Sequence, residues 1–323
     1  MTKKLNACFE WLFFGFLLSL AIFIALSGKY SATVLDGVNL FIASVLPALF
    51  PYFFITAILS AMSVTAKFSH MISPLTTRLF NVGGQVGYAF FMSVLCGYPV
   101  GAKTVCDLTE KNILSPSESV RASCLCSTSS PVFMISAVGN IMFKNSLFGL
   151  LLFCTHFISA ILTGIIFSFY KRKERPNGFS LSQAQKVDNI LYNSAYSAVI
   201  SSFVVGSIIT IFYLFTQILY DLKVLTPLIS VIEFITGDKA TAQGIVYGLF
   251  ECTKGLKTLS QSGITTLSLP VSCALCSFGG LSVLFQSLSY LKKAKIKTAP
   301  FILSKIISAV ISFFMGLAFS FLL

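Results

Sequence analysis

The chain has 323 residues, of which 55% are hydrophobic and only 11% are charged, and its mean hydropathy is +0.86. A soluble fold could not cover this much apolar surface, so the composition predicts an integral membrane protein whose main partner is the lipid bilayer. The formal net charge of +12 does not indicate nucleic-acid binding, because the basic residues cluster at the ends of apolar runs, where they are typical of topology signals.

The N-terminal part of the chain predicts two membrane-crossing helices and one helix in the membrane interface. Phe9–Ser27 is apolar over a longer stretch than a signal-peptide core, so a retained span is favoured over a cleaved leader. Asp36–Met62 predicts a second span with a kink at Pro47 and Pro51. Ala66–Asn81 alternates polar and apolar residues with a helical period, which is typical of a helix lying in the interface plane.

Two interrupted segments follow. Gln85–Lys111 contains the sequence CGYPVGAK at residues 96–103, and we interpret it as a re-entrant hairpin. Glycine and proline interrupt helices, and the freed backbone groups are tolerated in hydrocarbon only beside a cavity or other protein. Pro116–Phe143 predicts a full crossing with a break at Ser127–Pro131, and a capping signature precedes it at Ser115–Glu118.

A basic stretch at residues 171–178 separates the chain into two halves, and the last span before it is Leu147–Tyr170. We therefore expect an N-terminal helix at 1–34, a first repeat at 35–175 and a second repeat at 176–323. The second half repeats the order of the first, with a span at Leu191–Leu219, an interfacial helix at Val224–Ile235, a hairpin at Thr241–Gln261 broken at Gly248–Gly255, a span at Thr266–Leu291 broken at Ser277–Gly280, and a final span at Phe301–Leu323.

Short sequences recur between the halves: Ser123–Ser127 resembles Ser272–Ser277, and Ile158–Ala160 matches Ile307–Ala309. Each half is predicted to cross three times, an odd number, so the two copies must face opposite ways. Inverted repeats with broken helices are typical of secondary transporters. With the N-terminus in the cytoplasm, 15 of the 23 Lys and Arg residues fall inside and four outside, which favours seven spans and an external C-terminus.

The predicted fold class is therefore an all-α polytopic membrane protein with about seven transmembrane helices and two re-entrant hairpins in two inverted repeats. The nine cysteines lie in or beside apolar runs, so we expect free thiols. Cys273 and Cys276 form a CxxC pair, but no second pair or histidine follows at zinc-ligand spacing, so close helix packing is favoured over a metal site. No metal or cofactor is predicted, and a coupling ion, Na⁺ or H⁺, is left open.

Five blocks of the chain, in order, resemble the YlbJ/SpoVV-type sporulation integral membrane proteins with a nucleoside-transporter/FeoB Gate domain. The blocks are Phe50–Phe53, Gly97–Lys103, Ser129–Phe133, Gly248–Gly255 and Phe278–Val283. The chain has Ser130 where the family usually has asparagine. The resemblance implies an architecture similar to that of concentrative nucleoside transporters, movement of dipicolinic acid into the spore, and a bacterial cytoplasmic or forespore membrane.

The four breaks are expected to surround one binding site near the membrane midplane. The candidate substrate-binding residues are Gly97, Tyr98, Gly101, Lys103, Ser127, Ser129, Ser130, Glu251, Thr253, Lys254, Gly279, Gly280 and Gln286. Lys103, Lys254 and the N-terminus of the half-helix after Ser130 favour a small anionic or polar aromatic solute. Structural alternatives stay open: Lys103 could pair with Asp107, and Glu251 could neutralise Lys254 or Lys257.

Two other functions are compatible with the same sequence features. A nucleoside transporter is one alternative, because Glu251, Gln286 and the serines could bind ribose and a base edge. A non-transporting membrane scaffold in sporulation is the other, although it would not need two sets of helix breaks. No enzyme is expected, because neither His70 nor His156 has a nucleophile motif around it and there is no Gly-rich phosphate loop. Homo-oligomerisation is left open.

Overall fold

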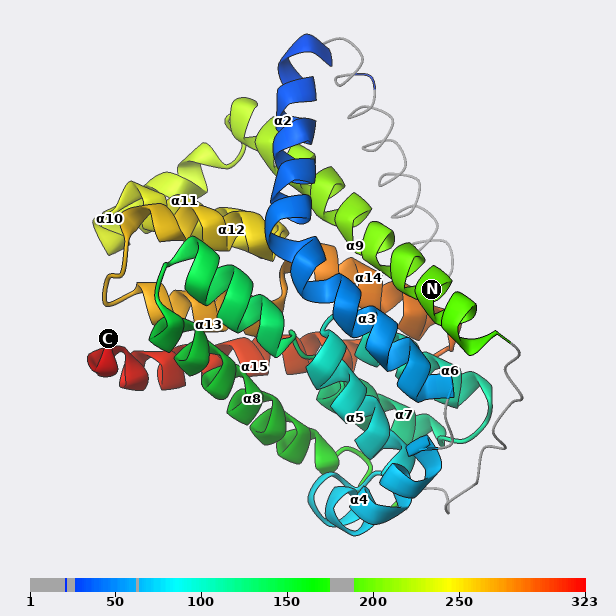
Figure 1. Ribbon diagram of the computed structural model, residues 1–323. Coiled ribbons are helices and arrows are strands. Elements are labelled where there is room, and N and C mark those ends of the chain that lie inside the picture. Colours follow the sequence, from blue (N-terminus) through cyan, green and yellow to red (C-terminus); the bar gives the residue numbers. More distant parts are fainter. Residues whose placement is uncertain (1–20, 22–26, 62–63, 175–188) are drawn as a thin grey trace, which may run out of the picture.

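The computed structural model describes residues 21, 27–61, 64–174 and 189–323, and these residues are helical with no strand (Figure 1). The predicted span Phe9–Ser27 and residues 175–178 of the predicted boundary lie almost wholly outside them. The elements before residue 175 are α2 (Ser27–Leu40), η1 (Phe41–Val45), α3 (Leu46–Ala61), α4 (Val64–Phe80), α5 (Gly84–Cys96), α6 (Val100–Glu110), α7 (Pro116–Leu125), η2 (Phe133–Met142) and α8 (Ser146–Ser168).

The second half has the same order of long, short and paired helices. Its elements are α9 (Ile190–Asp221), α10 (Thr226–Thr236), α11 (Lys239–Phe250), α12 (Cys252–Leu259), η3 (Ser260–Ser262), α13 (Ser268–Phe278), α14 (Gly280–Lys293), α15 (Thr298–Phe319) and η4 (Ser320–Leu322). The all-α polytopic class is confirmed, since four helical stretches of the described chain are long and apolar enough to cross a bilayer: α8, α9, α13 with α14, and α15 with η4.

Two bent helix pairs raise that number to six if each pair is one span. α2 and η1 meet α3 at 57°, and α4 meets α5 at 91°. The seven predicted spans stay a prediction, because the first lies outside the described residues and α7 and η2 have only 10 residues each. The bend before α3 falls at the expected Pro47. The second span was expected to begin at Asp36, but the helix begins earlier, at Ser27. The earlier residues are helical because α2 packs along α9, and Lys29 pairs with Asp221 at 2.7 Å.

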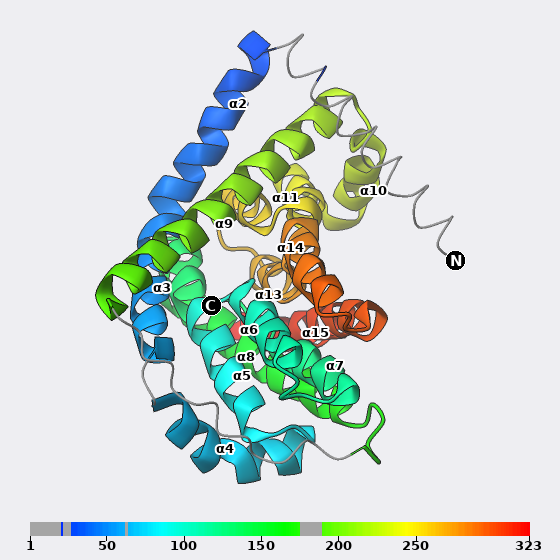
Figure 2. The same cartoon turned by 90° about the vertical axis from the view of Figure 1, so that its right-hand side faces the viewer.

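The two helices predicted to lie in the interface occupy opposite ends of the molecule. α4 lies at the lower end in both views, beyond the foot of α5, whereas α10 lies near the upper end beside α11 (Figures 1 and 2). Two repeats of opposite orientation would place their equivalent short helices in this way. The inverted order of the halves stays a prediction.

In both predicted hairpins, a hydrogen bond links the residue before the first helix to a residue in the element that follows the second helix. At the hairpin of α5 and α6, the backbone amide of Gly83 donates to Glu118 Oε1 at 2.7 Å. At the hairpin of α11 and α12, Ser262 Oγ donates to Asp238 Oδ2 at 2.6 Å, and the same carboxylate caps α11 through Thr241 N. Each hairpin thus enters and leaves at one end of the bundle.

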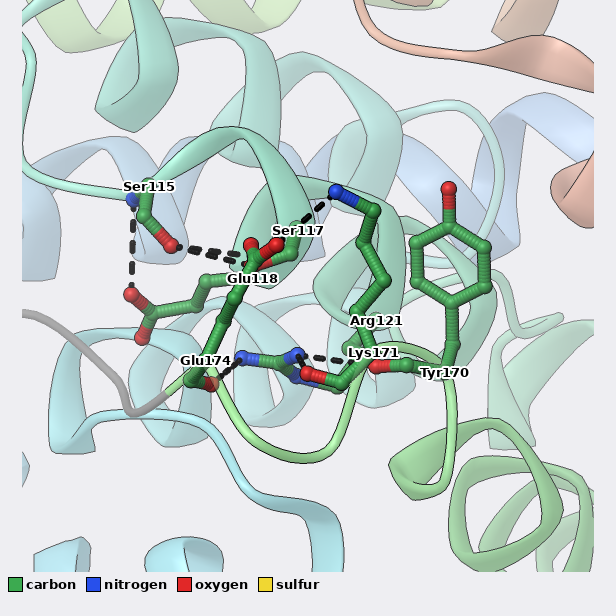
Figure 3. Close-up of polar contacts among 7 residues, drawn as sticks. All are labelled: Ser115, Ser117, Glu118, Arg121, Tyr170, Lys171 and Glu174. Carbon is green, nitrogen blue, oxygen red and sulfur yellow. Dashed lines mark hydrogen bonds and ion pairs between the residues drawn. The ribbon is translucent and has the colours of Figure 1, made fainter.

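A buried polar cluster fixes the start of α7, the helix that leads to the second break (Figure 3). Ser115 and Glu118 form the predicted capping box, with Pro116 in the first turn. The Arg121 side chain is 2% exposed. Its guanidinium donates to the backbone oxygens of Asn81 (2.9 Å), Tyr170 (2.9 Å), Lys171 (3.4 Å) and Glu174 (3.1 Å). Arg121 therefore ties α7 to the ends of α4 and α8.

The predicted topology can be tested by labelling three exposed lysine positions with a membrane-impermeant maleimide. We expect Lys173→Cys and Lys295→Cys to react from the same face of the membrane and Lys223→Cys to react from the opposite face. The unmodified chain is a suitable control, because seven of its eight described cysteines are buried. Labelling of residues 173 and 295 from opposite faces would contradict the inverted arrangement.

Candidate functional site

Four helix breaks interrupt the bundle within the stretches that the sequence predicts. They are Gly97–Pro99 between α5 and α6, Cys126–Ser130 between α7 and η2, Glu251 between α11 and α12, and Gly279 between α13 and α14. Gly97 has φ 76° and Gly279 has φ 83°, and this left-handed backbone favours glycine. Each break leaves backbone donors and acceptors without helical partners, and these must be satisfied inside an apolar bundle.

Side chains from other helices satisfy the break at Cys126–Ser130. The amide of Thr128 donates to Ser93 Oγ of α5 at 3.2 Å, and the amide of Ser129 donates to His156 Nε2 of α8 at 3.0 Å. Within the break, Ser130 Oγ accepts from Phe133 N at 3.2 Å and so caps η2. The break is therefore a fixed feature that α5 and α8 hold in place.

His156 connects this break to the one at Gly279. Because Nε2 accepts from Ser129, the neutral ring carries its proton on Nδ1, which lies 2.8 Å from Ser277 Oγ. The imidazole is 1% exposed and belongs to the apolar helix α8. It thus acts as a rigid bridge between the two broken spans.

Lys305 of α15 makes the matching bridge from the other half. Its ammonium donates to Tyr98 Oη at 2.7 Å and to the carbonyl of Ser127 at 3.3 Å. Tyr98 Oη in turn donates to the carbonyl oxygens of Cys276 and Ser277, at 3.1 and 3.3 Å. Lys305 and Tyr98 together satisfy backbone groups at two breaks, and Tyr98 itself belongs to a third.

These contacts come in pairs across the two halves. Ser159 Oγ of α8 lies 2.9 Å from Ser308 Oγ of α15, and the sequence already matched these two serines as repeat equivalents. His156 and Lys305 each lie three residues earlier on the same two helices. Each of them contacts the break of the opposite half, at Ser277 and Ser127 respectively. Equivalent residues meeting in this way are expected at the axis of an inverted repeat.

Glu251 forms the third break and caps the helix that follows it. Its carboxylate accepts from Thr253 N at 3.0 Å and from Lys254 N at 2.6 Å, which places the acid at the N-terminus of α12. No ion pair joins Glu251 to Lys254 or Lys257 in the described chain. The predicted neutralisation of these lysines is therefore replaced by helix capping.

The four breaks meet at one cavity of about 70 Å³. Its polar wall comes from the breaks themselves, and its apolar wall comes from η1, α3, η2, α9 and α14. The lining residues are Val45, Leu49, Cys96, Gly97, Tyr98, Ser129, Ser130, Phe133, Val205, Ile209, Glu251, Cys252, Thr253, Cys276, Gly279, Ser282, Val283 and Gln286. This volume has room for a few water molecules, whereas pockets for drug-sized ligands hold about 300 Å³ or more. A solute of aromatic-ring size therefore needs the breaks to move apart.

The structure brings eight of the thirteen predicted site residues to this cavity. They are Gly97, Tyr98, Ser129, Ser130, Glu251, Thr253, Gly279 and Gln286. Ser127, Gly101 and Gly280 lie behind the wall, where they pack the broken segments against each other. A Cβ on Gly280 would lie 3.0 Å from the carbonyl oxygen of Gly248, and one on Gly101 would meet the carbonyl oxygen of Cys126. Their role in the structure is close backbone approach.

Neither lysine that favoured an anion in the sequence lies in the cavity wall. The Lys103 side chain is exposed on α6, and it forms no ion pair with Asp107. Lys254 is buried but faces α9, where Nζ donates to Tyr213 O and Gln217 Oε1, both at 3.3 Å, and lies 4.3 Å from the Tyr213 ring. The two hairpin lysines thus point away from the cavity: Lys103 points to the surface, and Lys254 points to α9.

The two residues that bridge the breaks, His156 and Lys305, are not among the site residues predicted from the sequence. Each is the one ionisable residue of a long apolar helix, so no local motif surrounds it. A usable signal was present: both lie one turn before the matched serines of the repeat. When both halves carry a polar residue at the same position of the repeat, these residues are expected to lie near the axis that relates the two halves.

No protein-family model and no solved structure matches the chain. Among curated proteins, the chain is 25% identical over 302 residues to the "Sporulation integral membrane protein YlbJ" of Bacillus subtilis (strain 168). The match covers 85% of the chain and 73% of the relative, so it extends over both halves. The chain is thus similar to this YlbJ protein over most of its length. The YlbJ-type similarity and the apolar helices together identify it as an integral membrane protein.

Proposed function

We propose that the chain is a secondary membrane transporter that binds a small anionic or polar aromatic solute in the cavity between the four breaks. The observation that carries this proposal is the meeting of all four breaks at one cavity. Broken helices that meet between two opposed repeats form the substrate site of many secondary transporters. A scaffold would not require this arrangement, because unbroken helices pack more simply.

The proposed substrate class is a small aromatic carboxylate such as dipicolinate, which the family resemblance implies. The cavity offers hydroxyl and amide donors from Ser129, Ser130 and Gln286 to carboxylate oxygens. Its apolar wall of Phe133 and aliphatic side chains suits a ring. We place the protein in the bacterial cytoplasmic or forespore membrane with its N-terminus in the cytoplasm, acting on a small solute without a nucleic-acid partner and without catalysis.

Uptake into proteoliposomes tests this proposal. We expect the purified chain to accumulate radiolabelled dipicolinate above empty vesicles and to carry uridine at least tenfold less well. Gln286→Leu removes a cavity amide of similar size and should weaken dipicolinate uptake by about three- to tenfold. Lys103→Gln, at an exposed site away from the cavity, should leave uptake unchanged.

The alternatives give different results in the same assay. Uptake of uridine without dipicolinate would favour the nucleoside alternative, for which Glu251 and Gln286 are suitable hydrogen-bonding residues in the wall. Absence of uptake and binding for both solutes, with a monodisperse protein, would contradict transport and favour the scaffold.

A further inference from the structure

Lys305 is a buried cation without an anionic partner. It lies in α15 with 2% of its surface exposed, and its ammonium is 4.2 Å from the Tyr98 ring centroid in addition to its two hydrogen bonds. No carboxylate of the described residues lies within ion-pair distance of it. A charged group inside a membrane bundle is costly without a counter-charge, so such residues generally serve a function.

The surroundings of Lys305 leave hydrogen-bonding capacity unused. An ammonium has three donors, and only Tyr98 Oη and Ser127 O accept from it. The Ser127 hydroxyl is buried and has no hydrogen-bond partner. A charged donor and a hydroxyl without a partner, on residues that contact each other, fit the oxygen atoms of an anion.

Tyr98 joins Lys305 to the cavity wall. The phenol lines the cavity and accepts from Lys305, while it donates to the end of α13. The ammonium is thus one side chain behind the wall. Displacement of this phenol by a solute would free the Lys305 donor.

The one acid in the cavity wall does not neutralise this charge. Glu251 accepts from two amides at the N-terminus of α12, where the helix dipole balances a carboxylate. It makes no hydrogen bond or ion pair with Lys305. The lysine therefore remains the unbalanced charge at the site.

We propose that Lys305 supplies the positive charge that makes the four-break cavity select anionic solutes, and that Tyr98 holds the ammonium until the solute carboxylate replaces the phenol. This inference rests on the proposed function and assigns its selectivity to one residue. Lys305 takes the role that the sequence assigned to Lys103 and Lys254. The ligand class is a carboxylate small enough to lie between the breaks.

Binding of two ligands of the same shape tests the assignment. Dipicolinate carries two carboxylates, and pyridine-2,6-dicarboxamide is its neutral counterpart. Isothermal titration calorimetry on the wild type should show tighter binding of dipicolinate. In Lys305→Gln we expect the ratio of the two affinities to fall about tenfold or more, with diamide binding retained. Lys103→Gln is the matched control and should keep the wild-type ratio.

A second variant covers the case in which Lys305→Gln does not fold. Tyr98→Phe keeps the charge but removes its competing acceptor, so dipicolinate affinity should rise about threefold relative to the diamide. An unchanged ratio in a folded Lys305→Gln, or an unchanged or lower ratio in Tyr98→Phe, would overturn the assignment and leave the transport proposal standing. Failure of the wild type to bind either ligand would remove both.

Discussion

Gly101→Ala is expected to unfold the protein at a markedly lower temperature than the wild type. A Cβ at this position would lie 2.5 Å from Ser93 Oγ and would collide with the carbonyl oxygen of Cys126. Because the carbonyl oxygen of Cys126 belongs to the backbone and cannot rotate away as a side chain can, α6 must move away from the break at Cys126–Ser130. Overpacking of this kind costs about 3 kcal/mol, which exceeds the gain of about 1 kcal/mol that alanine brings to a helix.

The measurement is thermal unfolding in detergent with a thiol-reactive dye, because most described cysteines are buried and react only on unfolding. Gly28→Ala is the matched control, since Gly28 lies in α2 with no atom within 4 Å of an added Cβ. It should leave the midpoint unchanged or raise it slightly. Equal midpoints for the two alanine variants would show that the close approach of α6 is not required.

Arg121→Ala is expected to be the most destabilising change outside the cavity. The guanidinium donates to four backbone oxygens just beyond the ends of α4 and α8, and Figure 3 shows the contacts with Tyr170, Lys171 and Glu174. Its removal takes the donor away from all four oxygens. Each unsatisfied group costs about 1–3 kcal/mol, so a loss of several kcal/mol is expected even after water enters. Arg121→Lys should recover only part, because an ammonium lacks the planar fork of five donors.

Arg172→Ala provides the comparison for this change. Arg172 has the same charge, lies near the same cluster and is exposed, so its removal should shift the unfolding midpoint little. The same dye assay measures all three variants. If Arg121→Ala and Arg172→Ala have the same unfolding midpoint, the link between α7 and the ends of α4 and α8 contributes nothing to stability.

The helix breaks were the part of the fold that could best be predicted from the sequence, because glycine and proline interrupt a helix at their own positions. Gly97, Pro99 and Gly279 mark their own breaks, and backbone angles at both glycines show why. The break at Glu251 lies within the predicted stretch but at an acid, because the carboxylate caps α12 directly. The start of α2 was misplaced, since packing on α9 extends a helix through residues of weak local preference.

The candidate site was only partly accessible, because facing directions within a short helix depend on tertiary packing. Hairpin spacing could not show that Lys103 is exposed and that Lys254 meets Tyr213. The contact of Lys305 with Tyr98 joins residues 207 positions apart, and no local pattern predicts it. Repeat alignment is the exception, since it relates His156 to Lys305 without any structure.

His156 and Lys305 hold the same place in the two halves but differ in chemistry. One is a neutral ring that bridges two breaks, and the other is an ammonium that depends on a phenol. If the halves exchange conformations, as alternating access between opposed repeats requires, the inward-open and outward-open forms release different bridges. Their free energies are then unequal, so the empty protein rests predominantly open to one side of the membrane. A chain of two identical repeats would have no such directional preference.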